Sequence, residues 1–178
     1  MKRTLVLALG LMLVPAVASA QFEVGLDVFG LTYSDVDGAQ DAAIGVGLPL
    51  SGMRVGFWGG ETLLIETRME ADWDKEGDAS ATSLMLVPGV NFLVTPQVYV
   101  RGEAGLQYFK LDPGTGTSFS GTQYLFGAGV GMRRPLGEGA VLRLEGGLTK
   151  GLESLDGAIA FASSTNIHVS AGVSAIIN

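Results

Sequence analysis

Hydrophobic and polar residues alternate along most of the chain, most clearly from Ser83 to Lys110. This stretch predicts two β-strands around a tight turn at Thr95-Pro96-Gln97. In the second strand, one face carries Val98, Val100, Gly102, Ala104, Leu106 and Tyr108, and the other carries Tyr99, Arg101, Glu103, Gly105, Gln107 and Phe109. Side chains of a strand point alternately to its two faces, so an arginine and a glutamate project from one side of an otherwise hydrophobic strand. That side requires water or a polar interior.

The same alternation predicts eight strands in all. They are Phe22–Tyr33, Leu48–Trp58, Thr62–Trp73, the two strands of Ser83–Lys110, Gly121–Arg134, Ala140–Gly151 and Thr165–Ile177. Short turns near Gly59, Pro96 and Gly137 alternate with longer connections, which are Ser34–Gly47, Asp74–Ser80, Leu111–Ser120 and Leu152–Ser164. This rhythm is typical of an all-β, eight-stranded antiparallel up-and-down transmembrane β-barrel. Two alternatives stay open: Ala42–Gly47 is either loop or strand, and Ala158–Phe161 either extends a hairpin or caps it.

The N-terminus has the features of a secretory signal peptide. Lys2 and Arg3 precede an apolar run from Leu5 to Val17, and the cleavage pattern Ala18-Ser19-Ala20 follows. We therefore expect residues 1–20 to be removed and residues 21–178 to form the barrel domain. An uncleaved transmembrane anchor is disfavoured, because a spanning helix needs about 20 apolar residues. The sequence contains no cysteine, which excludes disulfides, a lipidated cysteine and thiolate chemistry.

Charge distribution predicts which face of the strands lies inside. Eleven charged residues fall on the polar faces, six acids and five arginines: Glu23, Asp27, Arg54, Glu66, Arg68, Glu70, Arg101, Glu103, Arg133, Arg143 and Glu145. A soluble exterior would also use lysine, whereas arginine suits fixed, buried pairing with carboxylates. The lumen of an eight-stranded barrel is just wide enough to be filled by side chains. We therefore predict a lumen charge network, whereas a secreted lipocalin-like barrel would place its apolar residues inside.

The remaining charge lies at one rim. Without Lys2 and Arg3, the chain has 9 basic and 18 acidic residues, a net charge of −9, which argues against nucleic acid as a partner. The predicted longer connections, together with Asp72 beside one of them, account for all of this excess. Asp72 to Asp78 resembles the start of a calcium loop, but its twelfth position, Ser83, cannot supply the bidentate glutamate. A solvated hairpin loop is favoured, with shared binding of Mg²⁺ or Ca²⁺ and lipid phosphates as a looser hypothesis; no metal site or cofactor is predicted.

His168 and Ser170 provide the one candidate for catalysis. They share a face of the last strand in an H-x-S pattern that some outer-membrane lipid A deacylases use for acyl transfer, but no carboxylate follows them through Asn178. A hydrogen-bonded lumen histidine is therefore the favoured interpretation. Gly127, Gly129 and Gly131 alternate within a strand, so they are expected to make room for bulky lumen neighbours rather than to bind phosphate.

Several stretches together resemble the small outer-membrane β-barrel families, namely the OmpA-like transmembrane domain and the opacity-type porins. They are Gly52–Trp58, the strand with Arg101 and Glu103, Gly121–Gly131 and the alternating last strand. The resemblance implies a bacterial cell outer membrane location and contact with outer-membrane lipid and lipopolysaccharide. It also implies assembly by periplasmic chaperones and the barrel-assembly machinery, although the end Ile176-Ile177-Asn178 departs from the usual terminal aromatic residue.

The predicted function is structural or interactive, without enzymatic activity: a lumen filled by Arg–carboxylate pairs and acidic outer loops. The alternatives are a narrow porin-like channel, a secreted lipocalin-like binder of apolar ligands, and a lipid-modifying enzyme.

Overall fold

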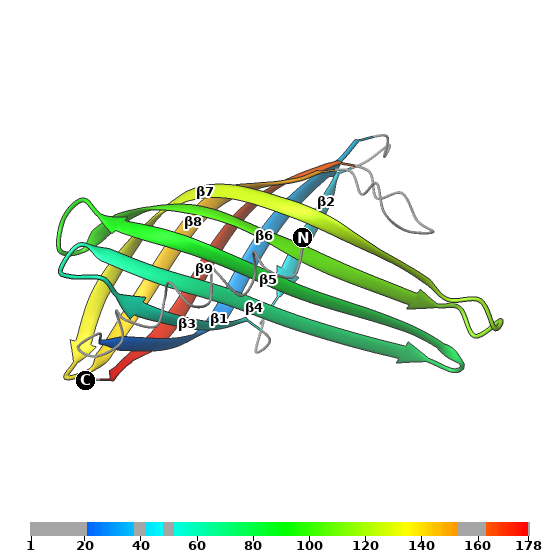
Figure 1. Ribbon diagram of the computed structural model, residues 1–178, viewed down its shortest axis with the longest axis horizontal. Helices are drawn as coiled ribbons and strands as arrows, with labels where there is room; N and C mark the ends of the chain where they lie inside the picture. Colours follow the sequence, from blue (N-terminus) through cyan, green and yellow to red (C-terminus); the bar gives the residue numbers. More distant parts are fainter. Residues whose placement is uncertain (1–20, 38–41, 48–51, 153–162, 178) are drawn as a thin grey trace, which may run out of the picture.

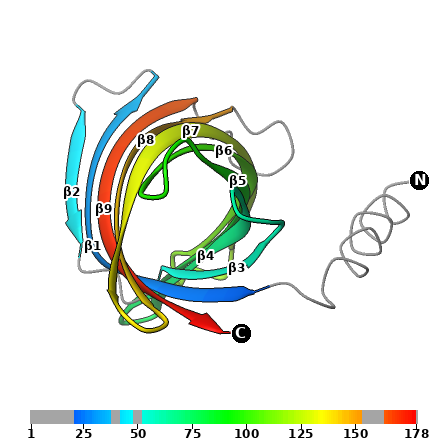
Figure 2. The ribbon, with the colours of Figure 1, turned by 90° about the vertical axis from the view of Figure 1, so that its left-hand side faces the viewer.

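The computed structural model describes residues 21–37, 42–47, 52–152 and 163–177. The expected signal peptide, residues 1–20, lies outside the described residues, as does Ala158–Phe161. The described residues form nine strands: β1 (Phe22–Val36), β2 (Ala43–Gly47), β3 (Met53–Trp58), β4 (Leu63–Glu76), β5 (Ala79–Leu93), β6 (Val98–Asp112), β7 (Phe119–Gly137), β8 (Ala140–Gly151) and β9 (Ser164–Ile177). Each strand pairs antiparallel with its neighbours, and pairing of β1 with β9 closes the sheet into a barrel (Figures 1 and 2).

The nine strands fill eight positions of the barrel wall. Both β2 and β3 pair with the same edge of β1, through Gly30↔Gly47 and Leu26↔Met53, and so they are two parts of one wall position. The prediction of an eight-stranded antiparallel barrel is thereby confirmed. Ala42–Gly47 is strand rather than loop, since β2 covers Ala43–Gly47. Of the predicted strand Leu48–Trp58, the part from Met53 is β3, and residues 48–51 lie outside the described residues.

The prediction of an acidic loop at Asp74–Ser80 is wrong. The strands β4 and β5 stay paired up to Glu76↔Ala79, so only Gly77 and Asp78 form the turn. Gly77 has a φ of 60°, a left-handed conformation that glycine adopts without steric cost and that two-residue hairpin turns require. The two-residue alternation therefore continues through the acidic residues, whose charge had suggested a solvated loop.

Two further connections are also shorter than predicted. The loop predicted at Leu111–Ser120 covers fewer residues in the structure, because β6 continues to Asp112 and β7 begins at Phe119. At the opposite end, β7 continues to Gly137 and turns through Glu138 and Gly139 into β8. We call the end that carries the connections after β3, β5 and β7 the turn end, and the opposite end the loop end. Membrane barrels keep short turns on the periplasmic side, so the loop end is expected to face outward.

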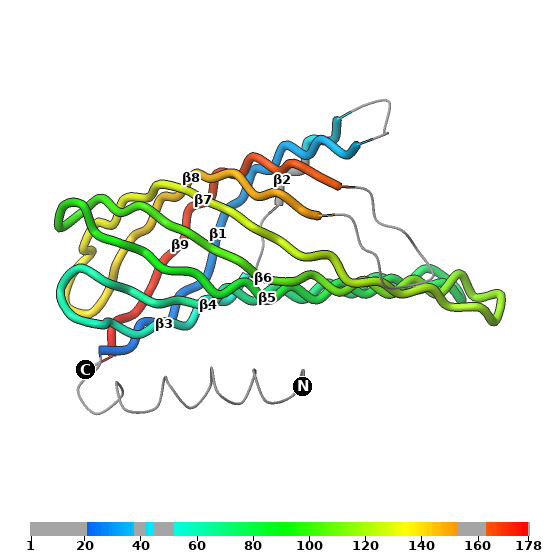
Figure 3. Tube along the Cα trace, turned by 45° about the horizontal axis from the view of Figure 1, so that its top comes forward, coloured from blue at the N-terminus to red at the C-terminus, as the bar shows by residue number. Residues whose placement is uncertain are grey.

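Four strands continue beyond the closed part of the barrel at the loop end. Among the described strands, β3 pairs with β4 only as far as Met69, and β8 pairs with β7 only from Leu125 onward. Beyond these points β4, β5, β6 and β7 pair only among themselves, and Figures 1 and 3 show them extending past the other strands. We call this extension, residues 71–83 and 109–122, the projecting sheet.

The barrel has an apolar exterior and a charged interior. Leu106, Phe126 and Val169 are 40%, 51% and 50% exposed, whereas Arg101 and Arg143 are 4% and 3% exposed. A water-soluble barrel would have the opposite arrangement, because exposing a continuous apolar band to water costs free energy. The alternative of a secreted lipocalin-like binder is therefore wrong. Within the described part of the chain, no helix combines the length and apolarity needed to cross a membrane.

Candidate functional site

The candidate site is the barrel lumen, where the structure brings together all eleven predicted charged residues. Each takes part in at least one ion pair, and the pairs form one connected network that reaches β1, β3, β4, β6, β7 and β8. Strand periodicity explains this convergence: the charged positions recur at every second residue, so each wall strand aims its charges at the axis.

Glu66 lies at the centre of the network. Its carboxylate accepts hydrogen bonds from Arg101, from Arg143 and, at 3.2 Å, from Nη1 of Arg54. These arginines come from β6, β8 and β3, and Glu66 comes from β4, so one carboxylate joins four strands. All four side chains are almost completely buried. A carboxylate in this setting is stable only because its partners replace the lost water.

A second carboxylate, Glu145, supports the same cluster. Its Oε2 accepts a hydrogen bond from Nη1 of Arg54 at 2.8 Å and one from the hydroxyl of Tyr99 at 2.7 Å. Arg54 also donates to Asp27 from Nε at 3.0 Å and from Nη2 at 2.8 Å. This two-point geometry uses the fixed fork of the guanidinium group, which lysine cannot reproduce.

The network continues to the turn end through Arg133. Its Nη2 donates to Glu23 at 2.7 Å, and its guanidinium carbon lies 4.5 Å from the centre of the Trp58 ring. A guanidinium over an indole face is a favourable cation–π arrangement. Arg143 lies 3.5 Å from the other oxygen of Glu23 and thereby connects this pair to Glu66.

The branch toward the loop end is more loosely paired. Arg101 donates from Nε to Glu103 at 2.7 Å, and Glu103 accepts from Arg68 at 3.5 Å. Arg68 then lies 3.6 Å from Glu70, whose side chain is 32% exposed. Because six acids face five arginines, the surplus negative charge belongs to this loosely paired outer end of the network.

Tyr99 lies on the polar face of its predicted strand but is not one of the eleven predicted site residues. The structure places its ring in the network, fully buried, with Arg143 5.6 Å from the ring centre. Gly131 makes this possible, because a Cβ at that position would collide with the Tyr99 ring. The pairing Tyr99↔Gly131 on adjacent strands is the relationship that could have identified it, but the strand register is needed to see that pairing. Asn91, also buried, accepts from Arg101 at 3.5 Å and was missed for the same reason.

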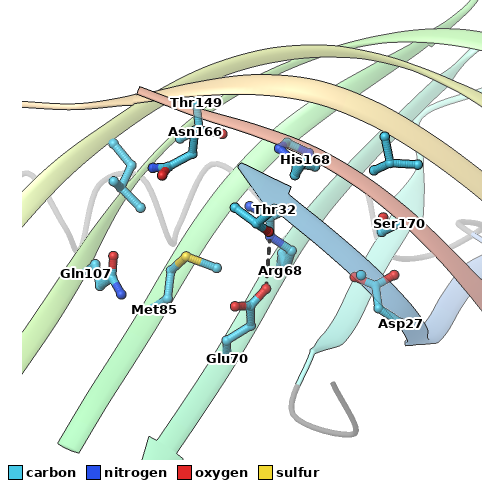
Figure 4. Close-up of a pocket in the computed structure, with 13 residues that line it drawn as sticks. Asp27, Thr32, Arg68, Glu70, Met85, Gln107, Thr149, Asn166, His168 and Ser170 are labelled. Atoms are coloured by element: carbon cyan, nitrogen blue, oxygen red, sulfur yellow. Dashed lines mark ion pairs between the residues drawn. The ribbon is translucent and has the colours of Figure 1, made fainter. Parts of the chain in front are cut away.

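Above the network, on the loop side, lies a chamber of about 380 Å³ (Figure 4). Asp27, Arg68 and Glu70 belong to both the network and the chamber lining. Figure 4 shows the remaining polar lining side chains on the surrounding strands: Thr32, Gln107, Thr149, Asn166, His168 and Ser170. The chamber lies in the loop-side half of the lumen, above the charge network.

His168 and Ser170 therefore face the chamber rather than the lipid. Gly147 leaves space for the His168 ring, since a Cβ there would lie 2.8 Å from Cε1 of the imidazole. The hydroxyl of Ser170 accepts a long hydrogen bond from Nη2 of Arg54 at 3.5 Å. In acyl transfer, by contrast, the hydroxyl of the nucleophilic serine is hydrogen-bonded to the histidine that activates it.

The structure contradicts the interpretation of Asp72–Asp78 as the start of a calcium loop. Asp72, Asp74 and Glu76 are strand residues of β4, which project from one face instead of encircling a site. Among the described residues there is no group of three or more histidine, cysteine, aspartate or glutamate side chains placed to hold a metal ion.

Comparison with known proteins identifies solved structures that share this fold. No protein-family model and no curated protein match the sequence. Solved structures match over most of the chain. Ail, the attachment invasion locus protein of Yersinia pestis, is 14% identical, with a TM-score of 0.53 over 87% of this chain and 97% of Ail. Neisserial surface protein A is 13% identical, with a TM-score of 0.54 over 88% of this chain and 96% of that protein.

The shared fold and the polarity of the two faces define the class. The chain has the fold of the small eight-stranded β-barrels of bacterial outer membranes. Its exposed apolar band and buried charges are those of a barrel that crosses the outer membrane. The predicted resemblance to small outer-membrane barrels is confirmed at the level of the fold.

Proposed function

We propose that this protein is a closed, non-enzymatic barrel of the outer membrane with a structural or surface-interaction role. The observation that carries the proposal is the connection of Arg143 on β8 through Glu66 on β4 to Arg54 and Arg101, which spans the lumen with buried side chains. At the level of this connection, an eight-stranded barrel leaves little other space for water or solutes. A sealed lumen leaves the loop end as the part of the molecule that is available for function.

The proposal includes the steps that precede function. Signal-peptide cleavage before Gln21, delivery by periplasmic chaperones and insertion by the barrel-assembly machinery would bring the chain to the membrane. The strands β1 to β9 have the alternating apolar and polar pattern that such assembly requires. In the membrane, outer-membrane lipid and lipopolysaccharide would contact the apolar exterior.

The chamber supports the narrow porin-like channel as the second candidate. It already provides about 380 Å³ of space in the loop-side half of the lumen, so a channel would need only a rearrangement of the network below it. The two candidates differ in whether the pairs around Glu66 part under physiological conditions.

Single-channel recording on purified protein in planar bilayers tests the choice. A closed barrel gives no conductance steps in the wild type, whereas replacement of Glu66 and Glu145 by alanine removes the central acceptors and opens a measurable path. Steady conductance of the wild type at neutral pH and moderate salt would overturn the closed-barrel proposal in favour of the channel.

A further inference from the structure

The two faces of β6 exchange polarity between the barrel and the projecting sheet. Within the barrel, the inward face of β6 carries Arg101 and Glu103 and its outward face is apolar. Farther along the same strand, the inward positions are Phe109 and Leu111, because the two-residue alternation continues without a bulge. The outward position between them is Lys110. On β6, the projecting sheet thus has apolar residues on its inner face at a height where the outer position is a lysine.

The register extends this inner face across three strands. Leu111 on β6 pairs with Ala81 on β5 and with Phe119 on β7. A cavity of about 320 Å³ lies over these residues, and Phe109 and Ser83 also line it. Leu111 is 46% exposed. This volume is at the lower end of the range of known ligand sites, about 300–1,000 Å³.

Carboxylates border the same cavity. Asp72 and Asp74 on β4 line it, and they share the inward face, since they pair with Ser83 and Ala81. Both lysines take outward positions in the alternation: Lys75 follows Asp74 on β4, and Lys110 lies between Phe109 and Leu111 on β6, where it also borders the cavity. The inner face is therefore apolar and negatively charged.

This combination discriminates between possible occupants. The head group of a fatty acid or of a phosphorylated lipid would bring negative charge next to Asp72 and Asp74, which costs free energy at short range. A segment with apolar side chains and flanking lysine or arginine residues satisfies both parts of the surface. Such complementarity raises association rate and specificity.

We propose that the inner face of the projecting sheet binds a cationic amphipathic peptide, with its apolar side chains over Leu111 and Phe119 and its cationic groups at Asp72 and Asp74. The proposal rests on the surface-interaction role proposed above and names the chemistry of the partner.

The test uses the full mature barrel in nanodiscs of zwitterionic lipid. The probe is a fluorescein-labelled peptide of alternating leucine and lysine, and its binding is measured by fluorescence anisotropy against empty nanodiscs. We expect saturable binding to the wild type. Replacement of both Asp72 and Asp74 by asparagine is expected to weaken binding about tenfold or more, and Leu111→Ser is expected to weaken it similarly.

Two matched controls separate this face from the rest of the sheet. Asp112→Asn removes one carboxylate from an outward position on β6, and asparagine can still accept the hydrogen bond from the Gly114 amide, which measures 3.0 Å. Trp73→Ser removes a large, 69% exposed apolar side chain from the outward position between the two aspartates. Both variants are expected to bind like the wild type. Heat-modifiable electrophoretic migration confirms that each variant is folded.

Several results would overturn the proposal. They are equal weakening by Asp112→Asn and the aspartate pair, equally tight binding of a leucine–serine peptide, displacement of the peptide by dodecanoate, and formation of a dimer that occupies the surface. The conductance experiment is independent: a silent barrel that fails to bind the peptide rejects this inference alone, whereas a conducting barrel rejects the closed-barrel function whatever the peptide does.

Discussion

Arg143 and Glu66 meet across the lumen although 77 residues separate them in the sequence. Their strands, β8 and β4, occupy opposite positions in the ring of eight. Direct contact between opposite walls means that the barrel interior is bridged at this level. Arg54 and Arg101 approach the same carboxylate from two further strands, so the bridge is branched rather than single.

Removal of the central carboxylate is expected to destabilise the barrel strongly. Glu66→Gln leaves three buried guanidinium groups without their shared anion. Breaking a buried ion pair by removing one partner typically costs about 3–5 kcal/mol. Urea unfolding in phospholipid vesicles, followed by tryptophan fluorescence, measures the free energy of unfolding.

Glu70→Gln is the control for this substitution. Glu70 also points inward, but its partner Arg68 lies 3.6 Å away and its side chain is partly exposed. A partly solvated pair of this kind contributes about 0–1 kcal/mol. Equal losses of stability in the two variants would contradict the central role of Glu66.

The hydroxyl of Tyr99 is expected to be important because it is buried against Glu145. Tyr99→Phe removes the donor at 2.7 Å and should lower the free energy of unfolding by about 1–3 kcal/mol. Tyr124→Phe removes the same group from an exposed position and should have little effect. The same urea titration compares them, and an unchanged stability of Tyr99→Phe would show that Glu145 needs no donor from Tyr99.

Gly131 is expected to tolerate no side chain while Tyr99 is present. Gly131→Ala places a Cβ in steric collision with the Cζ end of the Tyr99 ring, and forced overpacking typically costs about 1–3 kcal/mol. Gly102→Ala is the matched control, since no atom lies within 4 Å of a Cβ at that position. Combining Gly131→Ala with Tyr99→Ala should remove the steric part of the penalty. A full, additive loss in that double variant would contradict the steric explanation.

His168 is expected to have no catalytic role. It lines the chamber together with Ser170, which is engaged by Arg54. Cells that carry His168→Ala should therefore show the same lipid A acylation pattern by mass spectrometry as cells with the wild type. Loss of a deacylated species in the variant would restore the enzymatic alternative.

Much of this arrangement could be predicted from the sequence, because a two-residue period assigns each residue to a face without reference to its neighbours. Arg101 and Glu103 were assigned to one face for this reason, and the preference for arginine indicated that this face is internal. The partners could not be predicted. Whether Glu66 meets Arg143 depends on the register and closure of eight wall positions, which no local pattern contains.

The projecting sheet is the main feature of the fold that the sequence pattern did not predict. The charge of Asp74 and Glu76 predicts a loop, because acidic, hydrophilic stretches usually are loops. Their alternation with Trp73 and Lys75 is a strand pattern, and Gly77 allows the tight turn that ends it. In this segment the two-residue period predicts the backbone conformation better than the charge does.

The most direct test of the central claim uses the absence of cysteine from the sequence. A nitroxide label attached to Leu106→Cys or to Gln107→Cys reports its surroundings by electron paramagnetic resonance in lipid vesicles. The label at 106 should be relaxed by oxygen, which concentrates in lipid, and the label at 107 should be protected from oxygen because it faces the chamber. The opposite result, with position 107 in lipid and position 106 inside, would contradict an apolar exterior around a charged lumen.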